Sequence, residues 1–210
     1  MLSRSNKPFS DMIIPSIAVS ENRQYYPASR LTVEKTGKYA MKETIQYTIR
    51  ESSLGLTMAA VSGKGICAIL LGDSAKALTA DLKVRFPGAV IEKNDDALKE
   101  TVEAVVSYIG LPKGRFDGKL DVRGTEFQRK IWNQLRRIPA GTTASYTELA
   151  MALDAPNAVR AVAGACAANC LAVVIPCHRA VKDDGALSGY RWGVERKRKL
   201  LEMEGALPRG

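Results

Sequence analysis

The segment Leu171-Ala172-Val173-Val174-Ile175-Pro176-Cys177-His178-Arg179 joins an apolar run to a cysteine and to the single histidine of the 210 residues. Five consecutive apolar residues ended by a proline are typical of a short buried strand. The charged segment Lys182-Asp183-Asp184-Gly185 follows it and predicts a turn. We therefore expect a thiol and an imidazole to lie together where a buried strand ends.

Cys177 and His178 are candidates for nucleophilic chemistry. A thiol reacts as its thiolate, and because its ordinary pKa is about 8.5, it needs a proton acceptor or positive neighbours. His178 and Arg179 can supply both. The alternative is that Cys177 is an inert buried thiol and that His178 is a structural hydrogen-bond partner.

Residues on both sides of this segment carry a family resemblance. Asn169 stands eight residues before Cys177, and Ser188-Gly189-Tyr190-Arg191-Trp192-Gly193 follows it. Together with residues 176–179 they resemble the acceptor site of O6-alkylguanine-DNA alkyltransferases, particularly the alkyltransferase half of bacterial Ada proteins. The likeness extends over about residues 39–206. Within this range, residues 65–73, 123–125 and 127–128 add to the resemblance.

The resemblance implies an α+β fold in two parts. The first is a ribonuclease-H-like domain with a small antiparallel sheet, and the second is a mostly helical, winged helix-turn-helix-like domain. It also implies direct repair of double-stranded DNA, in which the alkyl group of O6-methylguanine passes irreversibly to Cys177 in a single turnover. O4-methylthymine is a second candidate substrate.

The composition is that of a folded, basic protein. Apolar residues make up 46% of the chain, which is enough for a hydrophobic core. The chain has 31 Lys and Arg against 22 Asp and Glu. Residues 111–210 alone hold 17 of these basic residues and 10 of the acidic ones. A basic half favours a polyanionic partner, because neutralising phosphates releases counterions. The alternative is a basic surface that only keeps the protein soluble.

The cysteines favour a reducing compartment. They stand at positions 67, 166, 170 and 177, and we find no pattern typical of a secretory signal or a membrane span. One histidine and no Cys-x-x-Cys pair are too few for common zinc sites. We therefore expect a cytoplasmic monomer with reduced thiols, without a metal or cofactor and without membrane association.

Three regions follow from the pattern along the chain. Residues 1–40 show no sustained period and are expected to be an extension or a linker remnant. Residues 41–114 are expected to form a structural domain that ends at Leu111-Pro112-Lys113-Gly114, where a helix stop meets turn residues. Residues 115–210 then form the DNA-binding and acceptor domain. In the first domain we expect an antiparallel meander over 44–50, 54–61 and 66–71, and helices over 74–86 and 95–109.

Two capping boxes predict helix starts in the second domain. They are Thr125 with Gln128, and Ser145 with Glu148. An apolar stripe on the first helix is expected to be core: Phe127, Ile131, Trp132, Leu135 and Ile138.

The helix expected over residues 158–168 has two unlike faces. One face suits burial: Val159, Val162, Ala163 and Cys166. The other carries one arginine among small residues: Arg160, Ala161, Gly164, Ala165 and Ala168. A face of small residues permits close approach to another surface. With the preceding short helix it predicts a helix-turn-helix that binds DNA. The alternative is a helix packed in the core on both faces.

The resemblance assigns roles to these residues. Ala161, Gly164 and Ala165 would lie in the minor groove, and Arg160 would replace an extruded nucleotide, since chemistry on a stacked base requires base flipping. Tyr146 matches a tyrosine that rotates the 3′ phosphate and supplies a proton to the flipped guanine. Without the resemblance, Tyr146 would be an ordinary residue of an amphipathic helix.

The resemblance also predicts the walls of the substrate pocket. Asn169 is expected to tie the DNA-reading helix to the Cys177 segment. The remaining pocket residues are Pro176, Arg179, Tyr190, Arg191 and Trp192. Arg191 replaces a serine and Ala172 a proline of some relatives, which leaves the range of accepted alkyl groups open.

The last predicted helix begins at residue 194. Glu204 stands on the face of this helix that is expected to be buried. A buried carboxylate must be paired. His178 is the candidate partner, and a Glu–His–Cys relay would make the imidazole a better base for Cys177. The alternative is that the helix frays and leaves Glu204 in water. The resemblance favours the relay, because Glu204 stands 27 residues after Cys177, as in relatives. Residues 195–199 are expected to form a solvated or phosphate-facing basic surface.

Two other functions fit parts of this pattern. An alkyltransferase-like protein would bind damaged DNA without chemistry, but such proteins usually have tryptophan in place of Cys177. A transcription regulator is the other, since Ada proteins couple repair to gene activation.

Overall fold

The structure, a computed structural model, describes residues 17–19, 25–27, 30–33, 39–187 and 189–207. Contacts divide the chain into two units, Met1–Glu43 and Thr44–Gly210. The first unit contains two short antiparallel pairs: β1 (Ile17–Val19) with β2 (Tyr25–Pro27), and β3 (Leu31–Val33) with β4 (Tyr39–Met41). Much of residues 1–40 lies outside the described residues, so their role as an extension or linker remains a prediction.

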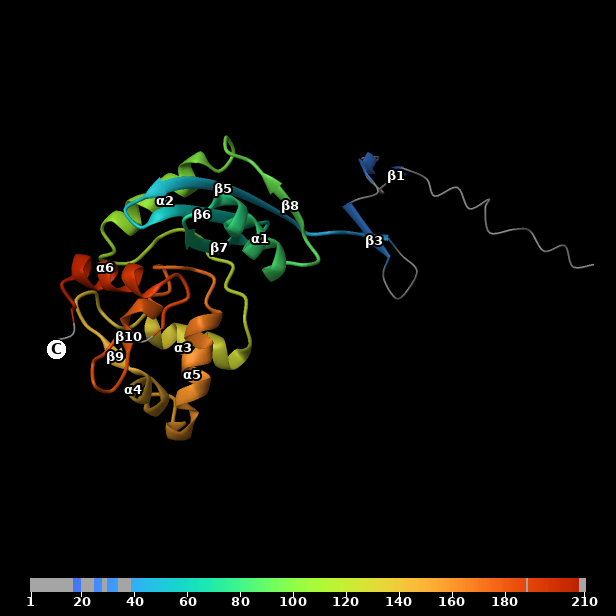
Figure 1. Cartoon of the computed structure of the whole chain (residues 1–210). Coiled ribbons are helices and arrows are strands. Elements are labelled where there is room, and N and C mark those ends of the chain that lie inside the picture. Colours follow the sequence, from blue (N-terminus) through green and yellow to red (C-terminus); the bar gives the residue numbers. More distant parts are fainter. Residues whose placement is uncertain (1–16, 20–24, 28–29, 34–38, 188, 208–210) are drawn as a thin grey trace, which may run out of the picture. The chain divides into compact units, whose positions relative to one another are not determined.

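A four-stranded mixed sheet begins the second unit (Figure 1). Its strands are β5 (Thr44–Ser52), β6 (Gly55–Ser62), β7 (Gly65–Gly72) and β8 (Val90–Lys93), in the order β7-β6-β5-β8. The first three form the expected antiparallel meander, but β8 pairs with β5 in parallel. The prediction of a purely antiparallel sheet is therefore wrong. β8 gives little signal in the sequence, because it has four residues and none is fully buried.

Two helices pack against the sheet as predicted. α1 (Ala75–Arg85) contacts β7, and α2 (Lys99–Gly110) contacts β5 and β6. The side chain of Ser74 accepts a hydrogen bond from the backbone N–H of Ala77 at 3.4 Å, the N-cap role that favours serine. Their apolar side chains form the inward faces, and all of these are buried: Leu78, Leu82, Phe86, Leu98, Val102, Val105 and Ile109.

Helices dominate the rest of the second unit. They are α3 (Glu126–Leu135), α4 (Tyr146–Met151), α5 (Val159–Ala168) and α6 (Val194–Glu204). Both predicted capping boxes are present, with reciprocal hydrogen bonds between Thr125 and Gln128 and between Ser145 and Glu148. The 3-10 turn η3 (Pro156–Ala158) joins α4 to α5. A short parallel pair, β9 (Ala144–Ser145) with β10 (Ala180–Val181), lies beside them. The fold is thus a mixed α+β fold.

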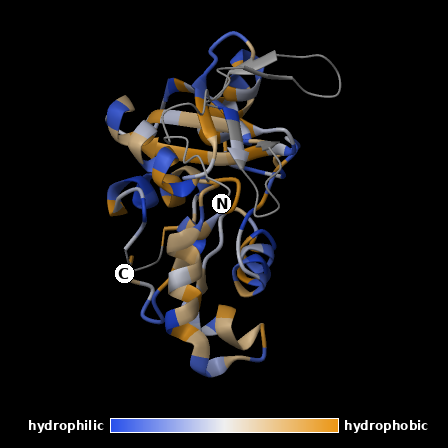
Figure 2. Cartoon of the chain, turned by 90° about the vertical axis from the view of Figure 1, so that its right-hand side faces the viewer, coloured by the Kyte–Doolittle hydropathy of each residue, from blue (hydrophilic) through white to orange (hydrophobic). Residues whose placement is uncertain are grey.

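A hydrophobic core continues from the sheet into the helices. In β7 the backbone N–H of Ile69 donates to the carbonyl of Cys170 at 2.8 Å, and its carbonyl accepts from Ala172 at 3.0 Å. In the predicted stripe of α3, Ile131, Trp132 and Leu135 are buried, while Phe127 and Ile138 are half-buried. Figure 2 shows hydrophobic residues along the strands and helices of this unit. In the part of the chain that the structure describes, no helix is long and apolar enough to cross a membrane.

The apolar run before Cys177 is buried as expected, but the predicted strand is wrong. Only Leu171 forms a bridge, parallel to Ile69. The N–H of Ile175 then donates back to the carbonyl of Leu171 at 3.0 Å, which makes a turn. Val173 has φ 67°, a left-handed conformation that is rare for a β-branched residue. The run therefore ends the sheet contact and turns the chain toward Cys177.

Candidate functional site

Cys177 begins a short 3-10 turn, η4 (Cys177–Arg179), directly after the buried apolar run. Its N–H donates to the carbonyl of Ile175 at 2.8 Å, and the residue is 4% exposed. The residue lines a cavity of about 300 Å³. The other lining residues are Tyr146, Ala163, Cys166, Ala167, Gly189, Tyr190 and Arg191. The thiol is shielded from bulk water but borders a space for a small ligand.

Asn169 connects α5 to this turn. It is the C-cap of α5 and is fully buried. Its Nδ2 donates to the carbonyl of Ile175 at 2.9 Å and to Sγ of Cys177 at 3.2 Å. Its Oδ1 accepts from the N–H of Leu171 at 2.8 Å. The geometry agrees with the predicted tie between the helix and the cysteine.

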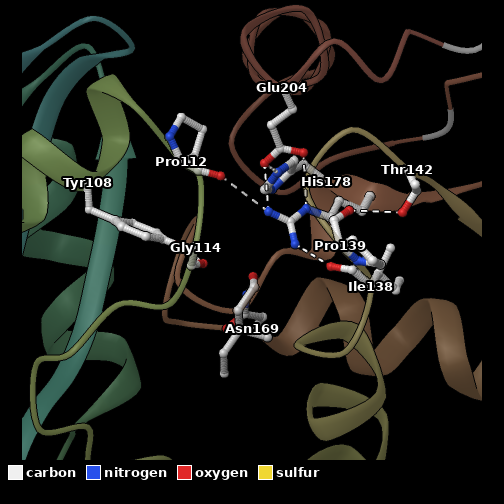
Figure 3. A network of polar contacts seen from close by, with 11 residues as sticks. Tyr108, Pro112, Gly114, Ile138, Pro139, Thr142, Asn169, His178 and Glu204 are labelled. Atoms are coloured by element: carbon white, nitrogen blue, oxygen red, sulfur yellow. Dashed lines mark hydrogen bonds and ion pairs between the residues drawn. The ribbon is translucent and has the colours of Figure 1, made fainter.

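Glu204, the last residue of α6, points toward His178 in the interior (Figure 3). It also accepts hydrogen bonds from Arg179. Its Oε1 lies 2.8 Å from Nε2 of His178 and accepts from Nη2 of Arg179 at 2.9 Å. Its Oε2 accepts from Nε of Arg179 at 3.0 Å. The side chains of Glu204 and His178 are both 0% exposed, so the fraying alternative is wrong. Gly205, with φ 75°, ends the helix immediately afterwards.

Burial controls the protonation states of the site. It raises the pKa of Cys177 to about 11, although the hydrogen bond from Asn169 and the charge of Lys197 act to lower that pKa. It also lowers the pKa of His178, against the pull of the Glu204 carboxylate. For Glu204, burial favours the neutral acid, but the hydrogen bonds from its two partners outweigh it and hold its pKa below the ordinary value. At neutral pH the site contains a thiol, a neutral imidazole and a carboxylate.

The exposed face of α5 is nearly the one predicted. Arg160, Ala161 and Gly164 are exposed, and a Cβ added to Gly164 would meet no atom within 4 Å. Ala168 is half-buried. Ala165 departs furthest from the prediction, because it is 3% exposed and its carbonyl accepts from Nε1 of Trp132 at 2.9 Å. The helix packs on Ala165 instead of Ala163, which is half-buried and faces the Cys177 cavity. The assignment of Ala165 to the exposed face is therefore wrong.

Comparison with known proteins identifies the family. Residues 126–206 match the model of the 6-O-methylguanine DNA methyltransferase DNA-binding domain. A methylated-DNA–protein-cysteine methyltransferase of Mycolicibacterium paratuberculosis is 44% identical over 112 residues, 53% of this chain and 68% of that protein. The crystal structure of Mycobacterium tuberculosis O6-methylguanine methyltransferase is 31% identical, with a TM-score of 0.64, over 80% of this chain and 96% of that one.

This chain belongs to the methylated-DNA–protein-cysteine methyltransferase family.

A longer relative shares most of the chain. The bifunctional transcriptional activator/DNA repair enzyme Ada of Escherichia coli is 43% identical over 188 residues. The match includes 88% of this chain but 53% of Ada, so the chain spans about half the length of that relative.

The pocket predicted for this methyltransferase-family chain is partly correct. Tyr146, Tyr190 and Arg191 line the Cys177 cavity, whereas Ser188 lies outside the described residues. Pro176 and Arg179 line a different cavity, of about 400 Å³, with Tyr108, Gly114, Arg115, Phe116, Asn133, Arg136, Arg137 and Val174. Trp192 is buried and borders a third one. Pro176, Arg179 and Trp192 therefore do not line the cavity that borders Cys177, and their part in a substrate pocket stays a prediction.

Arg179 connects Glu204 with two distant segments of the backbone. Besides its two bonds to Glu204, it donates to the carbonyl of Ile138 at 2.5 Å and to that of Pro112 at 3.4 Å. These partners lie far from Arg179 in the sequence, so its position beside Cys177 and His178 gave no sign of this role.

Two residues of the site were not predicted. Cys166 lines the cavity beside Cys177, and burial raises its pKa to about 12. Lys197 is fully buried and its Nζ donates to the carbonyl of Ala180 at 2.5 Å, although residues 195–199 were expected to be a solvated surface. Its position three residues before the buried Leu200 was the available signal. All four cysteines are free, and no group of acidic, His or Cys side chains among the described residues could hold a metal ion.

Proposed function

We propose that this chain repairs O6-methylguanine in double-stranded DNA by moving the methyl group irreversibly to Cys177. The observation that carries the proposal is the placement of the Cys177 residue. It borders a cavity of about 300 Å³, is held by Asn169, and adjoins the buried His178–Glu204 pair. The family membership supports the same reaction. O4-methylthymine is a second substrate of this proposal.

The reaction forms one bond and breaks one. Sγ of Cys177 attacks the methyl carbon, the bond between that carbon and O6 breaks, and guanine leaves. The thiol proton passes toward His178, whose Nδ1 is buried and has no hydrogen-bond partner in the described part of the chain. The departing guanine takes a proton from Tyr146, which lines the cavity. The product is a stable thioether, so each chain acts once.

The raised pKa of Cys177 explains the need for a base. A thiol with a pKa of about 11 is almost fully protonated at neutral pH. The lowered pKa of His178 keeps its imidazole neutral and able to accept a proton. The Glu204 carboxylate at 2.8 Å then stabilises the imidazolium. The three side chains together form the relay.

DNA binds through α5. Its exposed face of Arg160, Ala161 and Gly164 lets a groove approach closely, and Arg160 fills the space of the extruded base. The cavity lies beside this helix, since Ala163 and Ala167 of α5 line it. A base turned out of the duplex at α5 therefore enters directly beside Cys177. The crystal structure of a Mycobacterium tuberculosis relative in complex with DNA is 30% identical, with a TM-score of 0.62 over 79% of this chain and 96% of that one.

The finer fold assignments belong to the same proposal. The sheet with α1 and α2 is a ribonuclease-H-like domain that ends near residue 114. The segment α4-η3-α5 with the β9–β10 pair is a winged helix-turn-helix. We also propose a monomer acting in the cytoplasm.

Mass spectrometry tests the function. The protein is mixed with an equimolar duplex that contains one O6-methylguanine, and the intact protein and its peptides are weighed. We expect one methyl group on the Cys177 peptide, never more than one per chain, and none in Cys177→Ala. Tight binding without a methylated peptide would show instead a protein that only recognises damage.

A further inference from the structure

Arg191 lies at the edge of the Cys177 cavity and contacts two other elements. Its Nη1 donates to the carbonyl of Ala167 on α5 at 3.4 Å, and Ala167 lines the same cavity. Its Nη2 donates to Oδ1 of Asp81 on α1 at 2.9 Å. The Arg191 guanidinium therefore connects the loop of residues 189–191, which lines the cavity, with α5 and with α1.

Asp81 is itself held in position. Its Oδ2 accepts from Nε of Arg85, one turn further along α1, at 3.1 Å. The side chains of Asp81 and Arg191 are each 32% exposed, so solvent weakens their ion pair. Such a pair adds little to stability, but it limits where the Arg191 side chain can lie.

The loop around Arg191 has a second fixed point. Trp192 is buried, and the N–H of Gly193 donates to the carbonyl of Tyr190 at 2.9 Å. The C-terminal end of the loop is therefore anchored in the core. Gly189, Tyr190 and Arg191 of this loop line the Cys177 cavity. Because the Arg191 side chain lines the cavity and is 32% exposed, its movement toward solvent would widen the cavity.

On the basis of the proposed function, we propose that the ion pair between Asp81 and Arg191 limits the size of the alkyl group that reaches Cys177. With the pair formed, the cavity of about 300 Å³ accepts a guanine with a small O6 substituent. A larger substituent must push the guanidinium aside and break its bonds to Asp81 and Ala167. Asp81 does not line the cavity, so it is a positioning residue that acts through Arg191. This gives α1 a part in substrate selection.

The experiment compares two duplexes of the same sequence with a single O6-methylguanine or O6-benzylguanine. In both reactions Sγ forms a bond to the alkyl carbon, the bond from that carbon to O6 breaks, and the thiol proton is balanced by the proton gained by guanine. Alkylation of Cys177 is followed by mass spectrometry, and the benzyl-to-methyl rate ratio is measured. We expect Asp81→Asn to raise the ratio by about three- to fivefold, as for loss of a partly exposed ion pair. Asp81→Glu, which keeps the charge, should leave the ratio near that of the unchanged protein.

Asp73→Asn is the matched control. Asp73 pairs with Arg196 at 2.5 Å and so also connects the sheet half to the acceptor half, but both residues border a different cavity. A general loosening of the fold would change the ratio in both variants, whereas our proposal predicts a change only at Asp81. An unchanged ratio in Asp81→Asn, or an equal rise in Asp73→Asn, would overturn it. If the unchanged protein transfers no methyl group at all, the proposed function fails. The reaction with the O6-methylguanine duplex alone reveals this failure and so separates it from failure of the size limit.

Discussion

Nε2 of His178 lies 2.8 Å from Oε1 of Glu204, and neither side chain is reached by solvent. Because the carboxylate accepts a hydrogen bond from Nε2–H, Nδ1 is the nitrogen that can take a proton. Nδ1 is buried and has no hydrogen-bond partner among the described residues. In the proposed reaction, the pair therefore sets both the orientation and the tautomer of His178 as the base for Cys177.

Replacement of Glu204 by Gln should reduce both activity and stability. A neutral amide no longer stabilises the imidazolium, so we expect the methyl-transfer rate to fall by about 100-fold. The change also leaves the buried guanidinium of Arg179 without its carboxylate, which should lower the free energy of unfolding by about 3 kcal/mol. Single-turnover mass spectrometry and urea unfolding measure the two effects separately.

Glu202→Gln provides the control, because Glu202 is an exposed glutamate on the same helix. We expect it to leave the rate and the stability unchanged. Transfer at the normal rate by folded Glu204→Gln would contradict the relay.

The raised pKa of Cys177 predicts a loss of stability in alkali. Between about pH 9 and about pH 11, the unfolded chain has lost this proton and the folded chain keeps it. The free energy of unfolding therefore falls as pH rises through this range, by roughly 3 kcal/mol for Cys177 alone. Cys166, with a pKa of about 12, acts in the same direction.

Urea unfolding at about pH 8 and about pH 11 measures this loss. Cys177→Ser should remove the part that belongs to Cys177, while Cys166→Ser should remove the part that belongs to Cys166. An alkaline loss of the same size in Cys177→Ser and in the unchanged protein would show that the thiol does not keep its proton on folding.

Local patterns in the sequence predicted the parts of the site that depend on neighbouring residues. The capping boxes at Thr125 and Ser145 are short-range patterns, and both are present. The position of Glu204 on a buried helix face was also readable, because helical periodicity places it there. Its partner His178 followed, since the sequence has a single histidine.

Contacts between distant segments could not be predicted in the same way. Arg179 bonds to carbonyl groups of residues 41 and 67 positions away, and a sequence pattern contains no sign of such backbone partners. The rotation of α5 that buries Ala165 depends on the Trp132 indole of α3. β8 is recognisable only through its pairing with β5.

Arg160→Ala should separate base flipping from the chemistry of the thiol. Arg160 is exposed on α5 and does not line the Cys177 cavity. We expect methyl transfer from duplex DNA to slow by about 10-fold or more, because an unfilled gap in the base stack costs a few kcal/mol. Alkylation by free O6-benzylguanine, which needs no flipping, should keep its rate.

Arg129→Ala tests the alternative of a general charge effect. Arg129 is an exposed arginine on α3, so its loss changes the net charge equally. Equal slowing of the duplex and free-base reactions in Arg160→Ala would remove the role proposed for this residue.

Substitutions at Gly164 should test whether α5 approaches DNA closely. A Cβ at this position would meet no atom within 4 Å, and glycine inside a helix costs about 1 kcal/mol relative to alanine. Gly164→Ala should therefore raise the free energy of unfolding by about 0.5–1 kcal/mol with little effect on DNA binding. Gly164→Leu should also fold, but its side chain would stand between the helix and the groove.

We expect Gly164→Leu to weaken duplex binding by about 10-fold or more, measured by fluorescence anisotropy at fixed salt because phosphate contacts depend on salt. Its reaction with free O6-benzylguanine should stay normal, since Gly164 does not line the Cys177 cavity. Binding by the leucine variant as tight as by the alanine variant would mean that this face of α5 does not touch DNA. Gly164 would then need another explanation, because the open space around it shows that packing within the chain does not require a glycine there.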